Sequence, residues 1–460
     1  MARKNRTPTK LVRLDALKQI NLDACGIDVG DSAMHVAVPE DRDEQFVRVF
    51  GTFTRDLLSI AQWLTRCGIT SVAMESTGVY WIPLFEILVE HGFEVLLVDA
   101  RKVKNVSGRK TDIQDCQWIQ QLHTYGLLTG SFIPEQNIRA LRDLVRHRAT
   151  LLRYRAAHVQ HMQKTLQLMN LKLSNVISDI TGTTGLRILR SIVEGTTDPK
   201  YLASFRDPHC KHSQQDIELS LEGTYRKEYI FQLKQMLDLY DYYTSLVVDL
   251  DAKTESLYQQ LPSLVDPVEH PLKPLKRNVN KKSKNAPAFD LRTQLYRTCG
   301  VDLVQVDGLN VSLVQDIITD IGIDMSKWKT SKHFCAWLRL APNNKITGGK
   351  VFLSHTPKSK GRANKALRLA AFSLANAKCA LGAFYRRIRA KYGAPAANTA
   401  AAHKLARIIY KMLSDKVEYV DLGEDYYNEQ FRSRLVRNLK VKANALGFHL
   451  VPLEQLPSPV

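Results

Sequence analysis

The sequence predicts an α/β domain followed by a mostly α-helical remainder, made of a long coiled-coil region and a small C-terminal domain. Short apolar runs separated by turn residues fill the first quarter of the chain, which is typical of β-strands. Apolar residues then recur at steps of three and four over long segments, which indicates helices. A stretch rich in proline, lysine and asparagine precedes the last part, which is typical of a linker.

The N-terminal domain is predicted to span residues 22–130. Alternating apolar residues and short turns indicate an antiparallel meander at its start, and helices alternate with strands after it. The predicted elements are, in order, strands at 22–29, 34–38 and 46–50, a helix around 57–64, a strand at 69–74, a helix at 81–91, a strand at 94–98 and a helix from residue 112. This order describes the ribonuclease-H-like α/β fold.

Four acidic residues stand at informative places in this order. Asp28 lies in the first strand, Glu75 ends the fourth, and Asp112 and Asp115 open the last helix. Helical residues three apart share a face, and in a ribonuclease-H-like fold the strand acids meet a later helical acid. Magnesium prefers such oxygen ligands, and two ions can assist a phosphodiester displacement. We therefore predict a cation site, although each acid alone would also suit a helix cap or a solvated charge.

The composition restricts the class of partner. Lysine and arginine number 65 against 46 acidic residues, a net charge of +19, which favours nucleic acids or anionic membrane surfaces. No apolar run is long enough to span a bilayer, and no apolar segment follows the basic N-terminus as in a signal peptide. The seven cysteines form no CxxC pair, which indicates reduced thiols in a cytosol rather than disulfides or a zinc site.

A helical coiled-coil region is predicted over residues 136–262. From Ile138 to Val176, seam residues step alternately by three and four, as in a heptad repeat; an ordinary long core helix is the alternative. Arg148 and Arg155 interrupt the apolar seam. We expect them to set register and to contact nucleic acid. A second helical stretch, at 225–261, would pair with the first within the chain or between subunits, and both options stay open.

A basic linker is predicted at 263–290, a C-terminal domain at 291–423 and a helical tail at 424–460. In the C-terminal domain, Gly308 supports a tight turn between two helices, and such a turn can present amides to a DNA phosphate. Further on, a glycine pair beside a hydroxyl residue would let a phosphate approach the backbone closely; the alternative is a plain loop before a helix. The predicted nucleic-acid contacts of this segment are Gly348, Gly349, Lys350, Arg362 and Lys365.

Several of these segments resemble one known family. Gly-Ile-Asp28-Val-Gly, Ala-Met-Glu75-Ser-Thr-Gly-Val-Tyr-Trp81 and Arg-Lys-Thr-Asp112-Ile-Gln-Asp115 resemble the DEDD domain of the insertion sequence one-ten family transposases. Leu338-Arg-Leu-Ala-Pro-Asn-Asn-Lys-Ile-Thr347-Gly-Gly-Lys350 and Asn364-Lys-Ala-Leu-Arg368 resemble the second domain of that family. The resemblance implies a RuvC-like first domain that binds Mg²⁺ through the four acids. It also implies a serine in the second domain that forms a covalent link to DNA.

The same resemblance implies a homo-oligomer, dimeric or tetrameric, with a composite site across subunits, and a non-coding bridge RNA that specifies double-stranded DNA. It implies a bacterial cytoplasmic protein that joins the nucleoid during activity. This sequence has Thr347 where the family serine would stand, and Ser354 is the nearest downstream alternative. A threonine hydroxyl can be activated in the same way, although its β-branch restricts χ1.

We therefore expect a DNA transposase that cuts and rejoins DNA by Mg²⁺-assisted transesterification, through a covalent hydroxyl-linked intermediate. The alternative is a RuvC-like structure-selective endonuclease that uses water as its nucleophile. A nucleic-acid-binding scaffold without catalysis is a third interpretation.

Overall fold

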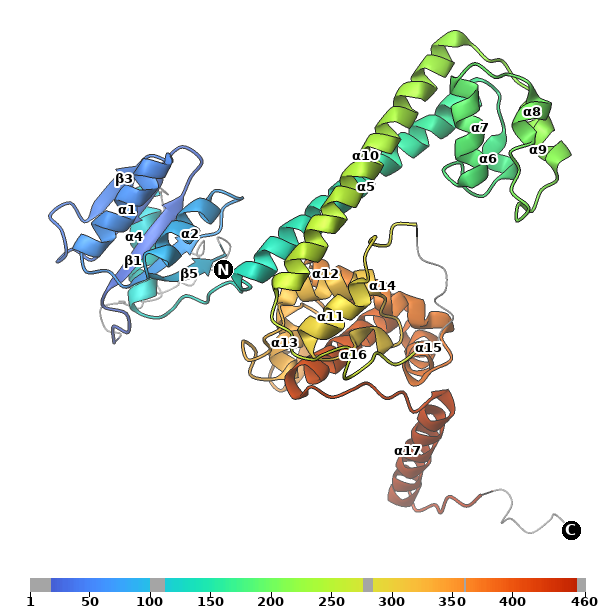
Figure 1. Ribbon diagram of the computed structural model, residues 1–460. Coiled ribbons are helices and arrows are strands. Elements are labelled where there is room, and N and C mark those ends of the chain that lie inside the picture. The colour runs from blue at the N-terminus through green and yellow to red at the C-terminus, as the bar shows by residue number, and fades with distance from the viewer. Residues whose placement is uncertain (1–17, 100–111, 276–283, 360, 453–460) are drawn as a thin grey trace, which may run out of the picture. The chain divides into compact units, whose positions relative to one another are not determined.

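The computed structural model describes residues 18–99, 112–275, 284–359 and 361–452. The chain divides into two compact units, Met1–Ile133 and Pro134–Val460 (Figure 1). None of the described helices combines the length and the apolar character that crossing a bilayer requires. All seven cysteines are free thiols, as the sequence predicts.

The first unit contains a mixed five-stranded sheet in the order β3-β2-β1-β4-β5. Strands β1 to β3 form an antiparallel meander, and β4 and β5 run parallel to β1. The α/β prediction for this region is therefore confirmed. The elements are β1 (Ala24–Val29), β2 (Met34–Ala37), β3 (Val47–Phe50), α1 (Thr54–Arg66), β4 (Ser71–Glu75), α2 (Trp81–Glu90), β5 (Glu94–Val98) and α4 (Asp112–Thr124).

Helices cover both faces of this sheet. Cys25, Ile27 and Val29 of β1 point to one face and share a buried core with residues of α1 and α2. The residues between them face α4, because side chains alternate along a strand. A Cβ at Gly26 would lie 2.2 Å from the Gln120 backbone nitrogen and 2.3 Å from the Cys116 carbonyl oxygen. Glycine at this position therefore allows α4 to lie directly against β1.

The second unit begins with α5 (Gln136–Leu168), which packs along α10 (Lys227–Gln260). Arg148 contacts Asp251 and Arg155 contacts Thr244, so later residues of α5 meet earlier residues of α10 and the pair is antiparallel. The structure thus shows the intrachain arrangement. Pairing between subunits stays a prediction. Leu151, rather than Leu152, is the buried residue of its turn.

Short helices close one end of this pair. Their residues share a buried core with the end of α5 and the start of α10. Asn170, with φ of 57°, ends the first long helix, so the predicted continuous seam stops before Val176. The helices are α6 (Leu173–Val176), α7 (Thr183–Val193), α8 (Pro199–Ala203) and α9 (Gln214–Ser220).

The C-terminal part of this unit is mostly helical but also contains a β-hairpin. Its elements are α11 (Leu291–Cys299), η2 (Leu303–Gln305), α12 (Val311–Ile321), α13 (Ser331–Trp337), β6 (Asn343–Thr347), β7 (Lys350–His355), α14 (Arg362–Ser373), η3 (Leu374–Asn376), α15 (Ala380–Tyr392), α16 (Ala394–Asp415) and α17 (Glu424–Ala445). The hairpin differs from the plain loop that is the alternative interpretation of this segment. None of the residues described in α17 is buried.

Candidate active site

Two of the predicted acids lie side by side on the sheet of the first unit. Strands β1 and β4 pair in parallel, with Ile27 opposite Met74, and Asp28 and Glu75 are the next residue of each strand. Neighbouring strands are about 4.8 Å apart. Alternation along the strands turns both carboxylates toward the face that α4 covers. The two acids therefore share one end of the two strands and one face of the sheet.

The first turns of α4 bring a third acid to this place. Burial, together with the negative charges of Asp28 and Asp115, raises the pKa of the Cys116 thiol to about 12. Both carboxylates therefore lie near the same buried thiol, one from β1 and one from α4. Helix α4 begins at Asp112, but the side chain of Asp112 lies outside what the structure describes.

Glu75 is the buried member of this group. Its residue is 7% exposed, and the Thr77 hydroxyl donates to Glu75 Oε1 at 3.0 Å. A buried carboxylate costs free energy unless it is hydrogen-bonded or meets a positive charge. Asp28, Glu75 and Asp115 offer carboxylate oxygens as donors. Such a donor set fits a hard divalent cation such as Mg²⁺.

The predicted nucleophile lies on the β6–β7 hairpin of the second unit. Thr347 pairs with Lys350, and Gly348 and Gly349 between them have φ of 57° and 76°. Two positive φ angles define the tight turn that suits such hairpins. All residues of both strands are exposed, and a Cβ at either glycine would meet open space. The turn therefore leaves its backbone accessible to a large ligand.

The hairpin register separates the two candidate hydroxyls. Ser354 pairs with Asn344, which is three residues from Thr347 on β6. The register shifts between Lys345 and Ile346, so regular alternation does not run from Asn344 to Thr347. Thr347 lies beside the turn, whereas Ser354 lies near the open end of the hairpin, so the two hydroxyls occupy different positions along it.

The other predicted contacts of this part of the chain differ in exposure. Lys350 and Lys365 are exposed, whereas Arg362 is half-buried and its guanidinium lies 3.9 Å from Asp316 Oδ1. Gly308 is buried, with φ of 90°, and a Cβ there would lie 2.7 Å from the Ala370 carbonyl oxygen of α14. The Gly308 turn is thus a close packing point between helices; phosphate contact by its amides stays a prediction.

Arg148 and Arg155 lie inside the α5–α10 pair. Each is 9% exposed, which differs from the nucleic-acid-facing position that the sequence suggests. Arg148 Nε and Nη2 donate to the two Asp251 carboxylate oxygens at 2.5 and 3.0 Å. Arg155 Nη2 donates to Asn285 Oδ1 at 2.8 Å. The difference arises because Asp251 of α10 binds Arg148 and Asn285 binds Arg155, and the α5 seam alone reveals neither partner. Contact of these arginines with nucleic acid stays a prediction.

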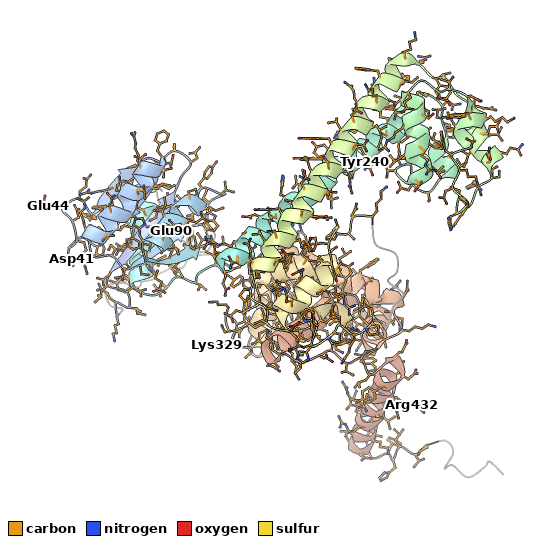
Figure 2. All side chains as sticks on the ribbon, viewed as in Figure 1. Asp41, Glu44, Glu90, Tyr240, Lys329 and Arg432 are labelled. Atoms are coloured by element: carbon orange, nitrogen blue, oxygen red, sulfur yellow. The ribbon has the colours of Figure 1, made fainter. Side chains whose placement is uncertain are left out.

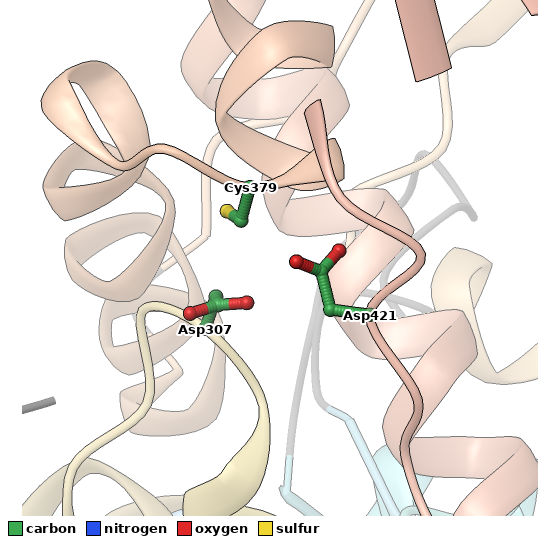
Figure 3. A group of neighbouring side chains, drawn as sticks. All are labelled: Asp307, Cys379 and Asp421. Carbon is green, nitrogen blue, oxygen red and sulfur yellow. The ribbon is translucent and has the colours of Figure 1, made fainter. Parts of the chain in front are cut away.

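A mixed group that the sequence analysis missed lies in the second unit. One ligand atom each of Asp307, Cys379 and Asp421 lies within 4.8 Å of the others, and the three side chains point toward one another (Figure 3). Cys379 Sγ accepts a hydrogen bond from the Gly382 amide, and Asp421 Oδ1 accepts one from the Ala380 amide. Both therefore cap the N-terminus of α15. No spacing in the sequence links these residues, because they come from three separate segments.

Comparison with known families agrees with this architecture. Residues 25–171 match a DEDD transposase model of the IS110 type, described as transposase. Residues 302–386 match a second model, described as transposase IS116/IS110/IS902 family. No curated protein matches the chain. The two models cover the sheet with its acids and the segment that contains the β6–β7 hairpin, about half of the chain together. The chain therefore belongs to the IS110 family of transposases.

Proposed function

We propose that this transposase cuts and rejoins DNA by transesterification, with carboxylates of the first unit and a hydroxyl of the β6–β7 hairpin as the two parts of its active site. The proposal is supported by Asp28 and Glu75, which lie side by side at one end of β1 and β4, and by the packing of α4, the helix that contains Asp115, against β1. Buried or half-buried carboxylates that lie at one strand end can bind a divalent cation.

Asp28, Glu75 and Asp115, with Asp112, would hold the cation, and Mg²⁺ is the ion that their oxygens suit. When bound, the ion supplies stabilisation of the charge that develops on the phosphate oxygens. The residues of the chain do the rest. The sheet fixes the strand carboxylates, and the Thr77 hydroxyl holds the Glu75 carboxylate by its hydrogen bond.

Thr347 is our proposed nucleophile. Its hydroxyl loses a proton and forms a bond to a DNA phosphorus, while the DNA oxygen that leaves takes up a proton. Attack by a DNA hydroxyl on the same phosphorus reverses the step and rejoins the strand. Lys350 pairs with Thr347 across the hairpin, so its ammonium group would lie beside the phosphate. Bond energy is conserved in the protein–DNA link, as strand exchange requires.

Partners of the proposed reaction follow from charge and from family membership. The net charge of +19 supports binding to a polyanion. We propose double-stranded DNA as the substrate and a non-coding bridge RNA as the guide that selects it. We also propose a homo-oligomer in which the hydroxyl and the acids come from different subunits.

The direct test incubates labelled double-stranded DNA that carries the element ends with the full-length protein, Mg²⁺ and the transcript flanking the gene. The products are separated on a denaturing gel. We expect a protein–DNA adduct that proteinase removes. Free nicked DNA without an adduct would instead support hydrolysis by water, the alternative nuclease function. The absence of both the adduct and the nicked DNA would contradict both reactions.

A further inference from the structure

Four cations from three helices gather in the second unit, apart from the hairpin. They are Arg387 of α15, Lys404 and Arg407 of α16, and Arg434 of α17, and we call them the α16 basic cluster. Burial, together with the positive charges of the three arginines, lowers the pKa of the Lys404 ammonium group. Each of the three arginines is therefore close enough to Lys404 for the two positive charges to repel.

Aromatic rings, rather than carboxylates, surround this cluster. Among the described residues, no carboxylate lies within the 4.0 Å of an ion pair from any of the four cations. Arg387 lies 4.3 Å from the Phe431 ring centroid, and Lys404 lies 4.6 Å from that of Phe384. Ring faces attract cations but carry no net charge, so they stabilise the cluster without neutralising its positive charge. Arg148 differs, since it has a buried carboxylate partner.

A cavity of about 420 Å³ extends this cluster along α16. Its lining includes Lys404, Arg407 and Lys411, against a single acid, Asp415. These three cations stand at i, i+3 and i+7, so they share one face of the helix and span about 10 Å. The row is longer than one phosphate group, so it suits several phosphates of one DNA strand better than one isolated anion.

Helix α17 adds further positive charge beside the cluster. It packs against α15, and its described residues are all at least partly exposed. Its later turns carry several basic residues, and Arg432 is one of them (Figure 2). Repulsion within the free protein and a row of exposed or half-buried cations together indicate a surface that binds a polyanion.

We propose that the α16 basic cluster, with Lys411, binds the phosphodiester backbone of DNA. This inference rests on the proposed function, which makes DNA the substrate, and it adds a binding surface that none of the sequence motifs indicated. The cluster would hold DNA through charge and without base recognition, because lysine and arginine contacts to phosphates carry no sequence information.

The test compares the full-length protein with the double variant Lys404→Gln/Arg407→Gln. Fluorescence anisotropy measures binding to a labelled DNA duplex over a series of salt concentrations. The slope of log affinity against log salt should fall by roughly one for each lysine or arginine that no longer meets a phosphate, and so by about two. The matched control, Lys234→Gln/Lys253→Gln, removes two exposed charges from α10 and should keep the wild-type slope. An unchanged slope in the cluster variant, or an equal fall in the control, would overturn the proposal.

Two further readouts distinguish this proposal from a structural role of the cluster and from RNA binding. The melting temperature of the cluster variant should equal or exceed that of the wild type, because repulsion is removed; a lower one with unchanged DNA affinity would show a structural role. A loss of binding to a labelled RNA hairpin but not to DNA would assign the surface to RNA and overturn the proposal. Failure of the wild type to form an adduct, with DNA affinity still dependent on the cluster, would remove the proposed transesterification and leave this surface standing.

Discussion

The two parts of the proposed active site are held by the fold in opposite ways. Asp28 and Glu75 lie on strands in the middle of a five-stranded sheet, and α4 lies so close that Gly26 admits no side chain. Thr347 lies on a two-stranded hairpin whose strand residues are all exposed. The carboxylates are therefore preorganised by packing, whereas the hydroxyl is presented on a surface that DNA or another subunit must position.

The largest expected effect comes from removing one carboxylate charge in the sheet while keeping the size of the side chain. Glu75→Gln keeps the size of the side chain and removes its negative charge. Loss of a partner that only supports a metal ligand costs about 10- to 100-fold, so loss of a ligand should lower DNA cleavage by more than roughly 100-fold. The assay is adduct formation with labelled DNA. Glu90→Gln, on the exposed end of α2 in the same unit (Figure 2), should cleave like the wild type. Equal loss in both variants would contradict a specific role for Glu75.

The second test concerns the hairpin. Because its strand residues are exposed, substituting its hydroxyl residues should change adduct formation without lowering the stability of the protein. Thr347→Ala should abolish the protein–DNA adduct on a denaturing gel, and Thr347→Ser should retain it. Ser354→Ala should have little effect, since Ser354 pairs with Asn344 near the open end of the hairpin, away from the Gly348–Gly349 turn. All three variants should melt at the wild-type temperature. An adduct that survives Thr347→Ala and disappears in Ser354→Ala would move the nucleophile.

These contrasts also show what the sequence could and could not predict. Alternation, turn residues and helical spacing are local signals, so they predict the strands and helices of the first unit to within a few residues; β5 is Glu94–Val98 in both. For residues 342–350 the sequence offers a plain loop as one alternative and does not indicate a hairpin. Strand β6 in this segment pairs with β7, whose residues are all exposed. Because neither face of β7 is buried, its sequence has no alternation of apolar and polar residues that would predict a strand.

The arginines of α5 show the same limit for tertiary contacts. Their spacing predicted the seam position correctly, and both are buried. Their partners could not be predicted, because Asp251 lies about a hundred residues away and is one of many acids. Likewise, the Asp307, Cys379 and Asp421 group forms only when three distant segments meet. Periodicity identifies which face is buried; it does not identify what lies against that face.

A third test breaks a packed polar contact for comparison with the exposed hairpin. Arg148→Met leaves the Asp251 carboxylate buried without its ion pair, so we expect a loss of about 3–5 kcal/mol in the free energy of unfolding. Urea unfolding followed by circular dichroism of the helices measures it. The double variant Arg148→Met/Asp251→Leu removes both charges and should regain most of the loss. If the single variant were as stable as the wild type, the buried ion pair would not stabilise the α5–α10 pair.

A smaller effect contrasts two glycines with positive φ. Gly308→Ala brings a Cβ to 2.7 Å from the Ala370 carbonyl oxygen at φ of 90°, which should cost about 1–3 kcal/mol of stability. Gly348 has φ of 57°, and a Cβ there would meet open space. Gly348→Ala should therefore strain only the exposed hairpin, by roughly 1 kcal/mol, and should not disturb the packing of the helices. Thermal unfolding should therefore report a lower melting temperature for Gly308→Ala alone. Equal melting temperatures would show that the Gly308 turn is not a close packing point.

The smallest effect is a pH dependence in the core of the first unit. Burial lowers the pKa of His123 below its ordinary value of 6.5, and its Nε2 lies 2.8 Å from the Ser71 hydroxyl. The unfolded chain therefore takes up this proton first as pH falls, and stability present above about pH 6.5 is lost toward the lower folded pKa. Melting temperatures from about pH 7.5 to about pH 5 should fall more for the wild type than for His123→Gln. Parallel curves would rule out this contribution.

The central claim, that the sheet acids hold a divalent cation, is tested most directly by metal binding. Electron paramagnetic resonance can count Mn²⁺ bound to the full-length protein, since Mn²⁺ accepts the oxygen ligands that suit Mg²⁺. We predict bound Mn²⁺ that Glu75→Gln reduces and that Asp421→Asn, in the capping group of α15, leaves unchanged. Wild-type Mn²⁺ binding in Glu75→Gln, or a loss that follows Asp421→Asn instead, would contradict this claim.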